Sequence, residues 1–374
     1  MTGTSPPVRV STLELFFDLV FVFSITQLTT VLVDDPTFRG AARAVVELGV
    51  LWWMYGGYAW LTNAVPPRST RIRLLLMVGM AGFLVMALAI PDAFGDSGVA
   101  FGVGYLVVTL VHTIGFLTTN ERPTMHAILR VAPFNLLSAC VVLGAGFVTG
   151  AADWVLWTGV FTLLWVTPWL ARIGGFTIVA SHFVERHGLV VIIVLGESIV
   201  AVGVGARGQR IGPALALAAL LGLALVAALW WLYFDGDDER AEVALTVAPA
   251  DRRTWLSLLS FGYCFVPMLA GVVALSAGVK LAIAHLDGHA SWAGTTFLAG
   301  GVALYVGAEA ALRAVLQMAA AGPRFVVAAL ALGTIVAGRL VSAELQMAAL
   351  LALLIALLIA ERRVGDNAPS GALA

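Results

Sequence analysis

Apolar runs of about 20 residues recur along the whole chain, and short segments that carry most of the Arg, Asp and Pro residues separate them. A helix that crosses a bilayer core needs about 20 mostly apolar residues. The chain is 60% hydrophobic and 11% charged, whereas about a quarter of an ordinary soluble domain is charged. The sequence therefore predicts an all-α membrane protein, a polytopic bundle of transmembrane helices in a lipid bilayer, without a sizeable water-soluble domain.

Breaks at Pro, Gly and charged clusters divide the chain into about 12 predicted spans. We place them near 11–33, 41–64, 72–91, 99–119, 127–149, 154–171, 185–205, 212–235, 254–276, 292–316, 324–341 and 344–360. The connection between the last two is so short that one broken helix would also fit.

The basic residues predict the orientation. With twelve spans, all but six of the 21 Lys and Arg residues fall on the N-terminal side of the membrane; the six are Arg39, Arg43, Arg207, Arg210, Lys280 and Arg339. The positive-inside rule then predicts that both ends are cytoplasmic, the N-terminal segment, 1–10, and the C-terminal tail, 361–374.

The two halves of the chain, 11–173 and 174–360, share a weak pattern. Leu51-Trp-Trp-Met-Tyr55 in the second span matches Leu229-Trp-Trp-Leu-Tyr233 in the eighth, and Glu14 at the start of the first span matches Glu185 at the start of the seventh. The match predicts two parallel six-helix repeats. Aromatic belts at the membrane interface would also place Trp and Tyr at helix ends.

Glu197 is the most promising ionisable residue, because nine helical residues from Gly188 onward precede it and place it near the bilayer midplane. Ionisable side chains at that depth are costly and usually serve a function. Glu197, beside Ser198, is expected to bind a proton or a cation, or to act as a general acid or base. The alternative is a structural carboxyl group that is protonated or hydrogen-bonded to Ser198.

Glu14 and Asp18 are four residues apart in the first span and share a helix face, with Gln27 further along. Ser11 to Glu14 has the form of an N-terminal capping box, which would give Glu14 a structural role. Asp18 lies among aromatic and aliphatic residues, so either a functional role or a structural ion pair is expected there.

The seventh span opens with His182, Glu185, Arg186 and His187. His182 is spaced to share a face with Glu185 and Arg186. The cluster could serve a function or could simply end a helix at the interface. No metal is expected, because the two histidines are five residues apart and no third ligand is near in sequence.

A second group of polar residues is expected to be buried and to line the same cavity: His112, Glu47 and Glu309. His112 could equally be a packing residue. Asp235 opens an acidic run, Asp235 to Glu239, that is most simply a solvated cytoplasmic loop.

Several function classes lose support. The net charge of -1 does not indicate a nucleic-acid partner. The sequence has no Gly-rich phosphate loop, nucleophile elbow or His-Glu-x-x-His motif, so no cofactor is expected and ATP-driven transport is not indicated.

Three blocks resemble signatures of the bacterial low-temperature-requirement A family: Glu14-Leu-Phe-Phe-Asp-Leu-Val-Phe-Val-Phe, the segment from His182 to Ser198, and Trp230-Trp-Leu-Tyr-Phe-Asp235. The resemblance extends over nearly the whole chain. Its motif positions fall on Glu14, Asp18, His182, Glu185, Gly196, Glu197 and Asp235. The resemblance implies a multi-spanning bacterial plasma-membrane protein linked by name to growth in the cold, but it supplies no biochemical activity.

Buried carboxylates and a suspected repeat lead to one hypothesis, a proton- or cation-coupled secondary transporter that moves a small solute past Glu197 and Asp18. The second hypothesis is an intramembrane enzyme for a lipid or isoprenoid, in which Glu14, Asp18, His182 and Glu185 form an acid–base cluster near the interface. The third is a membrane stress-adaptation protein without turnover.

Overall fold

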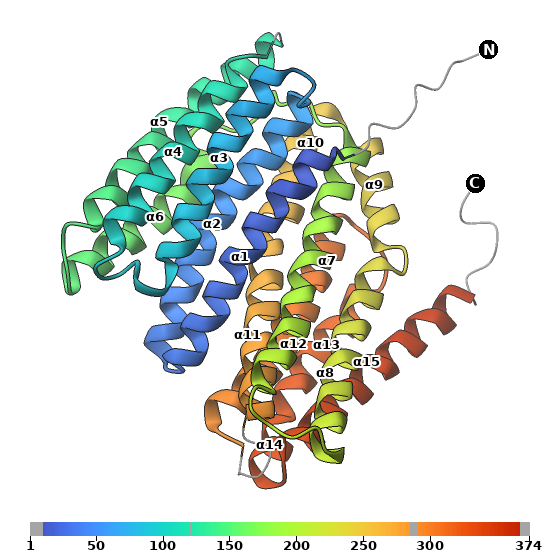
Figure 1. Ribbon diagram of the computed structural model, residues 1–374. Coiled ribbons are helices and arrows are strands. Elements are labelled where there is room, and N and C mark those ends of the chain that lie inside the picture. Colours follow the sequence, from blue (N-terminus) through green and yellow to red (C-terminus); the bar gives the residue numbers. More distant parts are fainter. Residues whose placement is uncertain (1–9, 120, 285–289, 367–374) are drawn as a thin grey trace. The chain divides into compact units, whose positions relative to one another are not determined.

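The computed structural model describes residues 10–119, 121–284 and 290–366, and these residues form helices without a β-strand (Figure 1). Most of the expected terminal segments, 1–10 and 361–374, lies outside the described residues. The chain forms two compact units: unit 1 comprises residues 1–193 and 241–266, and unit 2 comprises residues 194–240 and 267–374. The units are described separately, and the predicted six-helix halves stay a prediction.

Unit 1 contains the first six long helices and is built around α2 (Phe38–Ala64). α2 packs against α1, α4, α6 and the π-helical turn η2, while α3 packs against α1 and α4, and α5 against α4 and α6 (Figure 1). Their bounds are α1 (Thr12–Asp34), α3 (Thr70–Ala89), η1 (Ile90–Asp92), α4 (Gly98–Phe116), α5 (Arg122–Ala145) and α6 (Ala151–Leu170). The unit also includes the first part of α7 (Ala180–Gly205), most of α9 (Asp237–Val247), α10 (Ala250–Ser257) and η2 (Leu258–Tyr263).

Unit 2 contains the rest of α7, α8, the first residues of α9, most of α11, and α12 to α15. α12 packs against α13, α14 and α15, and α8 packs against α15 and α12. The bounds are α8 (Pro213–Phe234), α11 (Phe265–Ala284), α12 (Trp292–Val315), α13 (Ala321–Gly333), α14 (Ile335–Leu340) and α15 (Ala343–Asp366). Val341 and Ser342 interrupt the helices between α14 and α15, so the last two predicted spans are separate helices.

Ten stretches of the described residues are long and apolar enough to cross a membrane. They are Thr12–Asp34, Thr70–Asp92, Gly98–Phe116, Arg122–Ala145, Ala180–Gly205, Pro213–Val247, Ala250–Ala284, Trp292–Val315, Ala321–Leu340 and Ala343–Arg363. The chain is thus a multi-pass membrane protein.

α2 and α6, where spans 41–64 and 154–171 are predicted, are helical but fall outside this set, because Trp, Gly and charged side chains dilute their apolar residues. A total of twelve spans, the repeat and the orientation stay predictions.

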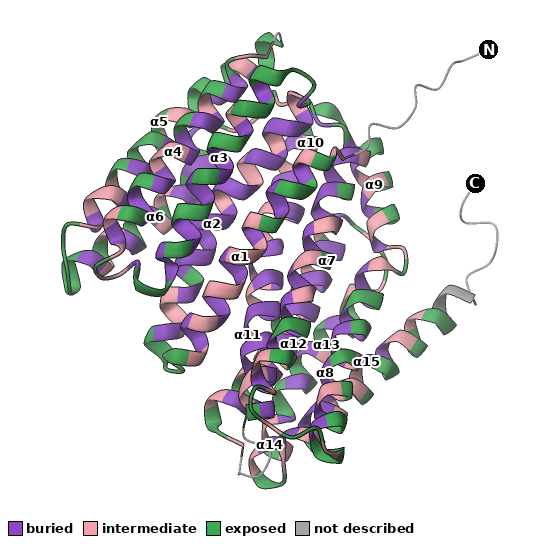
Figure 2. Ribbon diagram, in the orientation of Figure 1, coloured by how far each residue is buried: buried purple, intermediate pink, exposed green. Residues whose placement is uncertain are grey.

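Outward-facing apolar side chains show what surrounds these helices. Leu74 and Leu88 on α3, Val155 on α6 and Leu220 on α8 are large, apolar and exposed, whereas buried residues follow α2 along its length (Figure 2). A soluble protein rarely exposes large contiguous apolar faces. The exposed faces therefore suit lipid.

Glycines let the backbones of α11 and α12 come close together inside unit 2. A Cβ atom on Gly301 would lie 2.5 Å from the Leu275 nitrogen and 2.7 Å from the Gly271 oxygen. Both are backbone atoms, which cannot rotate away as the end of a side chain can. Small residues at such crossings are typical of helix packing in membranes.

We predict that Gly301→Ala lowers the free energy of unfolding by about 1–3 kcal/mol, because the added methyl group forces α11 and α12 apart. Thermal unfolding in detergent measures the loss. The matched control is Gly300→Ala, where an added Cβ meets no heavy atom within 4 Å. Equal melting temperatures for the two variants would contradict the close crossing.

Candidate functional site

The N-terminus of α1 places Glu14 in two roles at once. Ser11 and Glu14 form the predicted capping box: the Glu14 N–H donates to Ser11 Oγ, and the Ser11 N–H donates to Glu14 Oε2 at 2.8 Å. Glu14 Oε1 faces α7, 3.2 Å from His182 Nε2 and 3.4 Å from Arg186 Nη1. Glu14 therefore caps α1, as its spacing predicts, and also joins an ionic cluster.

Asp18 lies one turn later on the same face of α1, as its spacing predicts. Its Oδ1 accepts hydrogen bonds from the Tyr55 hydroxyl at 2.5 Å and from Arg186 Nη2 at 3.0 Å. Its Oδ2 has no hydrogen-bond partner among the described residues. One oxygen of Asp18 is thus fully used, and the other can hold a proton.

Asn63 fixes the orientation of His182. The Val179 N–H donates to Asn63 Oδ1 at 2.9 Å, so Asn63 Nδ2 is the atom that faces the Val179 carbonyl and His182 Nδ1, at 3.0 and 3.2 Å. Because an amide nitrogen only donates, Nδ1 of His182 accepts, and its proton lies on Nε2 toward Glu14. His182 is therefore a neutral imidazole in this arrangement.

Arg186 is the one cation among the five side chains, Glu14, Asp18, Tyr55, His182 and Arg186, that we call the unit 1 cluster. Its guanidinium reaches both carboxylates and lies 5.6 Å from the centre of the Tyr55 ring. Glu14, Asp18, His182 and Arg186 are between 1% and 3% exposed. With both carboxylates ionised, the formal charge of the cluster is −1 in a site that water hardly reaches.

A small cavity of about 10 Å³ adjoins this cluster, which is about the space of one water molecule. It is lined by Leu13, Glu14, Phe17, Tyr58, Thr62, Leu76 and Arg186. A water molecule in this cavity would therefore lie beside Glu14 and Arg186.

Unit 2 contains a second buried ionic cluster, formed by Asp237, Glu309, Arg313, Arg324 and Glu361 and called here the unit 2 cluster. Arg324 donates to all three carboxylates at 2.8–3.0 Å, and Arg313 donates to Asp237 and Glu361 at 2.8–3.0 Å. Arg324 also donates to the Leu232 carbonyl. Every nitrogen of both guanidinium groups is bonded, which suits a structural role.

The acidic run after α8 was predicted to be a solvated loop. The structure corrects this, because Asp237, Asp238 and Glu239 form the first turn of α9 and Asp237 is buried. Asp235 is 47% exposed and lies 3.6 Å from the exposed Arg362, as expected of a loop residue. Asp237 is only 3% exposed and bonds Arg313 and Arg324. The prediction failed because the two arginines lie 76 and 87 residues later in the chain, beyond any local pattern.

The sequence placed Glu185 and Gln27 with these residues, and the structure does not bring them to the cluster. Glu185 is exposed and accepts the Val10 N–H at 3.2 Å. The buried face of α7 carries His182 and Arg186, and residue 185 points away from it. Gln27 is half-buried on α1, 13 residues or about 20 Å beyond Glu14.

Glu197 is buried on α7 in unit 2, as predicted from its place in the span. Its neighbour Ser198 lies 2.7 Å from Ser276 across to α11, oxygen to oxygen. Asp18 belongs to unit 1 and Glu197 to unit 2. A common site for the two carboxylates stays a prediction.

The three residues expected to share one cavity lie in different places. His112 lines an aromatic cavity in unit 1. Glu47 is buried on α2 away from that lining, and its two oxygens have no hydrogen-bond partner among the described residues. Glu309 belongs to the unit 2 cluster.

Within the described chain, no group of three or more His, Cys, Asp or Glu residues is placed to hold a metal ion.

Comparison with known proteins gives two matches. The family model described as "Bacterial low temperature requirement A protein (LtrA)" matches residues 9–360. An uncharacterized protein of Rhizobium meliloti (strain 1021) is 28% identical over 284 residues, which cover 73% of this chain and 69% of that protein.

We predict that Arg324→Ala destabilises the protein by about 3–5 kcal/mol, because it leaves three buried carboxylates with one guanidinium. Arg362→Ala is the matched control: Arg362 is 56% exposed and its pair with Asp235 is long, so the loss should stay below about 1 kcal/mol. Thermal unfolding of both variants tests this. A similar, small loss in both would contradict a structural role for the unit 2 cluster.

Proposed function

The chain belongs to the bacterial low temperature requirement A family, and from this premise we propose that it is a secondary transporter that couples a small solute to a proton. The proton is held by the unit 1 cluster. One observation carries the proposal: two carboxylates that are almost inaccessible to water share a single arginine. A buried charge without a partner is costly, so binding one proton is favoured because it makes the cluster neutral.

The open oxygen of Asp18 is the natural place for that proton. Glu14 Oε2 is occupied by the cap of α1, and Asp18 Oδ1 by Tyr55 and Arg186. Glu14 Oε1 faces His182 Nε2 at 3.2 Å and Arg186 Nη1 at 3.4 Å. Asp18 Oδ2 makes no such contact. His182, held as a neutral imidazole with its proton toward Glu14, is in hydrogen-bond reach of a carboxylate and is suited to pass a proton.

Proton binding would change how α1 and α7 attract each other. With Asp18 protonated, Arg186 is balanced by Glu14 alone. With Asp18 ionised, Arg186 is divided between two carboxylates on α1 and a negative charge remains. Loss or gain of the proton therefore biases the relative positions of two long helices. Coupled transport requires such a proton-dependent equilibrium between two arrangements.

The intramembrane enzyme is less well supported by the same geometry. An acid–base site for lipid needs its groups to reach the substrate, whereas Glu14, Asp18 and His182 are at most 3% exposed. Glu185, the fourth member of that hypothesis, lies outside the cluster. A stress-adaptation protein without turnover would move no protons, and the experiment below detects that outcome.

We predict that Asp18→Asn abolishes solute-driven proton movement, because the remaining Glu14–Arg186 pair is neutral without a proton. Purified protein in liposomes that contain a pH-sensitive dye is given amino acids, monosaccharides, monocarboxylates and phenols, one class at a time. At least one class should change the internal pH in the native protein.

Glu185→Gln is the matched control, since it makes the same carboxylate-to-amide change at an exposed position on α7. It should keep the pH signal. A signal that survives in Asp18→Asn, or a native protein that gives none with any class, would contradict proton coupling through this cluster.

A further inference from the structure

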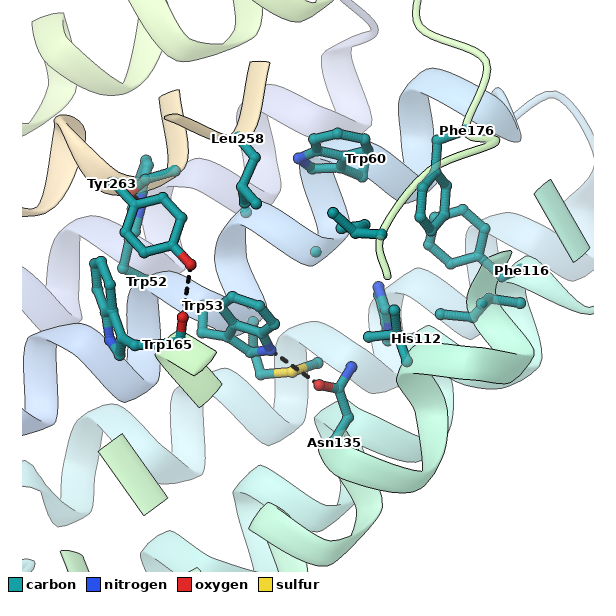
Figure 3. Close-up of a pocket in the computed structure, with 17 residues that line it drawn as sticks. Trp52, Trp53, Trp60, His112, Phe116, Asn135, Trp165, Phe176, Leu258 and Tyr263 are labelled. Atoms are coloured by element: carbon teal, nitrogen blue, oxygen red, sulfur yellow. Dashed lines mark hydrogen bonds between the residues drawn. The ribbon is translucent and has the colours of Figure 1, made fainter. Parts of the chain in front are cut away.

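Unit 1 contains a second feature, a cavity of about 80 Å³ on the other side of α2 from Asp18. Four helices, the 171–179 connection and the π-helical turn η2 enclose it, and Figure 3 shows Trp53, Trp60 and His112 around the same space. Its lining residues are Trp52, Trp53, Met54, Gly56, Gly57, Trp60, His112, Phe116, Ile128, Val131, Asn135, Trp165, Ile173, Phe176, Leu258, Gly262 and Tyr263.

Irregular helix geometry surrounds this cavity. Leu258, Gly262 and Tyr263 come from η2, a π-helical turn, and such turns often lie at functional sites. α5 contains Pro133 two residues before Asn135, and α6 contains Pro168 three residues after Trp165. The wall is braced by hydrogen bonds from Trp52 Nε1 to the Gly262 carbonyl at 2.9 Å and from the Tyr263 hydroxyl to the Trp165 carbonyl at 2.6 Å.

The lining selects an uncharged, planar ligand. None of the 17 lining residues is Asp, Glu, Lys or Arg, so an ionic group would enter without a counter-charge. Four indoles, two phenyl rings and a phenol supply faces and edges against which another ring can pack. Trp53, Trp60 and Phe176 are half-buried, so the cavity is not fully closed.

His112 supplies a hydrogen-bond acceptor inside this aromatic lining. It is 4% exposed, and its Nδ1 has no hydrogen-bond partner among the described residues. Its Nε2 lies against α2 at Gly57, whose backbone forms a hydrogen bond with the imidazole. Nε2 therefore carries the proton, and Nδ1 is left as an acceptor. The ring is held by Phe116, edge to face at a centroid distance of 5.0 Å. A buried nitrogen without a partner is costly unless a ligand bonds it.

We propose that this cavity binds one planar, uncharged ring that carries a hydroxyl or N–H group and donates it to His112 Nδ1. The volume is about half of the roughly 150 Å³ of an engineered cavity that holds benzene. The cavity therefore accommodates at most one ring, and the rest of the ligand lies outside the enclosed space. The site shares no residue with the unit 1 cluster. Its test is therefore independent of the proposed proton coupling.

The probes are 4-methylphenol, which has a donor, and 4-methylanisole, which has the same ring without one. Binding to the purified protein in lipid nanodiscs is measured by equilibrium dialysis, and the signal of empty nanodiscs is subtracted. 4-Methylphenol should bind about tenfold more tightly than 4-methylanisole, the effect of one buried hydrogen bond. His112→Phe keeps a ring and removes the acceptor, so it should erase this preference.

Occlusion gives a second test that does not depend on His112. A Cβ on Gly56 would meet no heavy atom within 4 Å, so Gly56→Leu should fold and fill the cavity, and both probes should lose binding. Gly159→Leu is the control, because Gly159 is equally open and lies outside the lining. Binding that persists in Gly56→Leu would overturn the site. Equal affinity for both probes in the native protein, or a preference that survives in His112→Phe, would overturn the role of His112.

Discussion

The division of Arg186 between Glu14 and Asp18 is the constraint on which the functional account depends. Burial makes each unpaired charge costly, and one guanidinium cannot neutralise two carboxylates. α1 contributes both acids and α7 contributes the base, because residues four apart lie on one face of a helix. The cap at Ser11, the Tyr55 hydroxyl and the Asn63 amide then hold each partner in place. The surplus negative charge follows from this geometry and is the reason we propose a proton site there.

The unit 2 cluster shows that buried ions by themselves do not indicate function. It has three carboxylates and two arginines, and its formal charge is also −1. However, both guanidinium groups are fully bonded and Glu361 remains 16% exposed, so water can carry part of the surplus charge. In the unit 1 cluster, Arg186 Nε, Arg186 Nη1 and Asp18 Oδ2 lack hydrogen-bond partners within the described chain. The unit 2 cluster also has one carboxylate oxygen without such a partner, Glu309 Oε1. The difference therefore lies in the guanidinium groups, which are fully bonded in Arg313 and Arg324 but not in Arg186.

Local patterns predicted the parts of this protein that depend on local physics. Apolar runs predicted the helices, and the Ser11–Glu14 spacing predicted the cap and the shared face of Glu14 and Asp18. Charge spacing alone placed Glu185 wrongly, because it cannot tell which face of α7 is buried. The pairing of Asp237 with Arg313 and Arg324 depends on contacts between distant helices. The tryptophans of α2 resemble an interfacial belt in the sequence, and only packing beside η2 shows that they surround His112.

Infrared spectroscopy of the carboxyl groups tests the central claim most directly. If the unit 1 cluster holds one proton, the native protein at neutral pH has a carbonyl stretching band of a protonated carboxylic acid that Asp18→Asn removes. Glu185→Gln should leave that band unchanged. Identical bands in the native protein and in Asp18→Asn would contradict the account, because they would mean that Arg186 is shared by two ionised carboxylates without a bound proton.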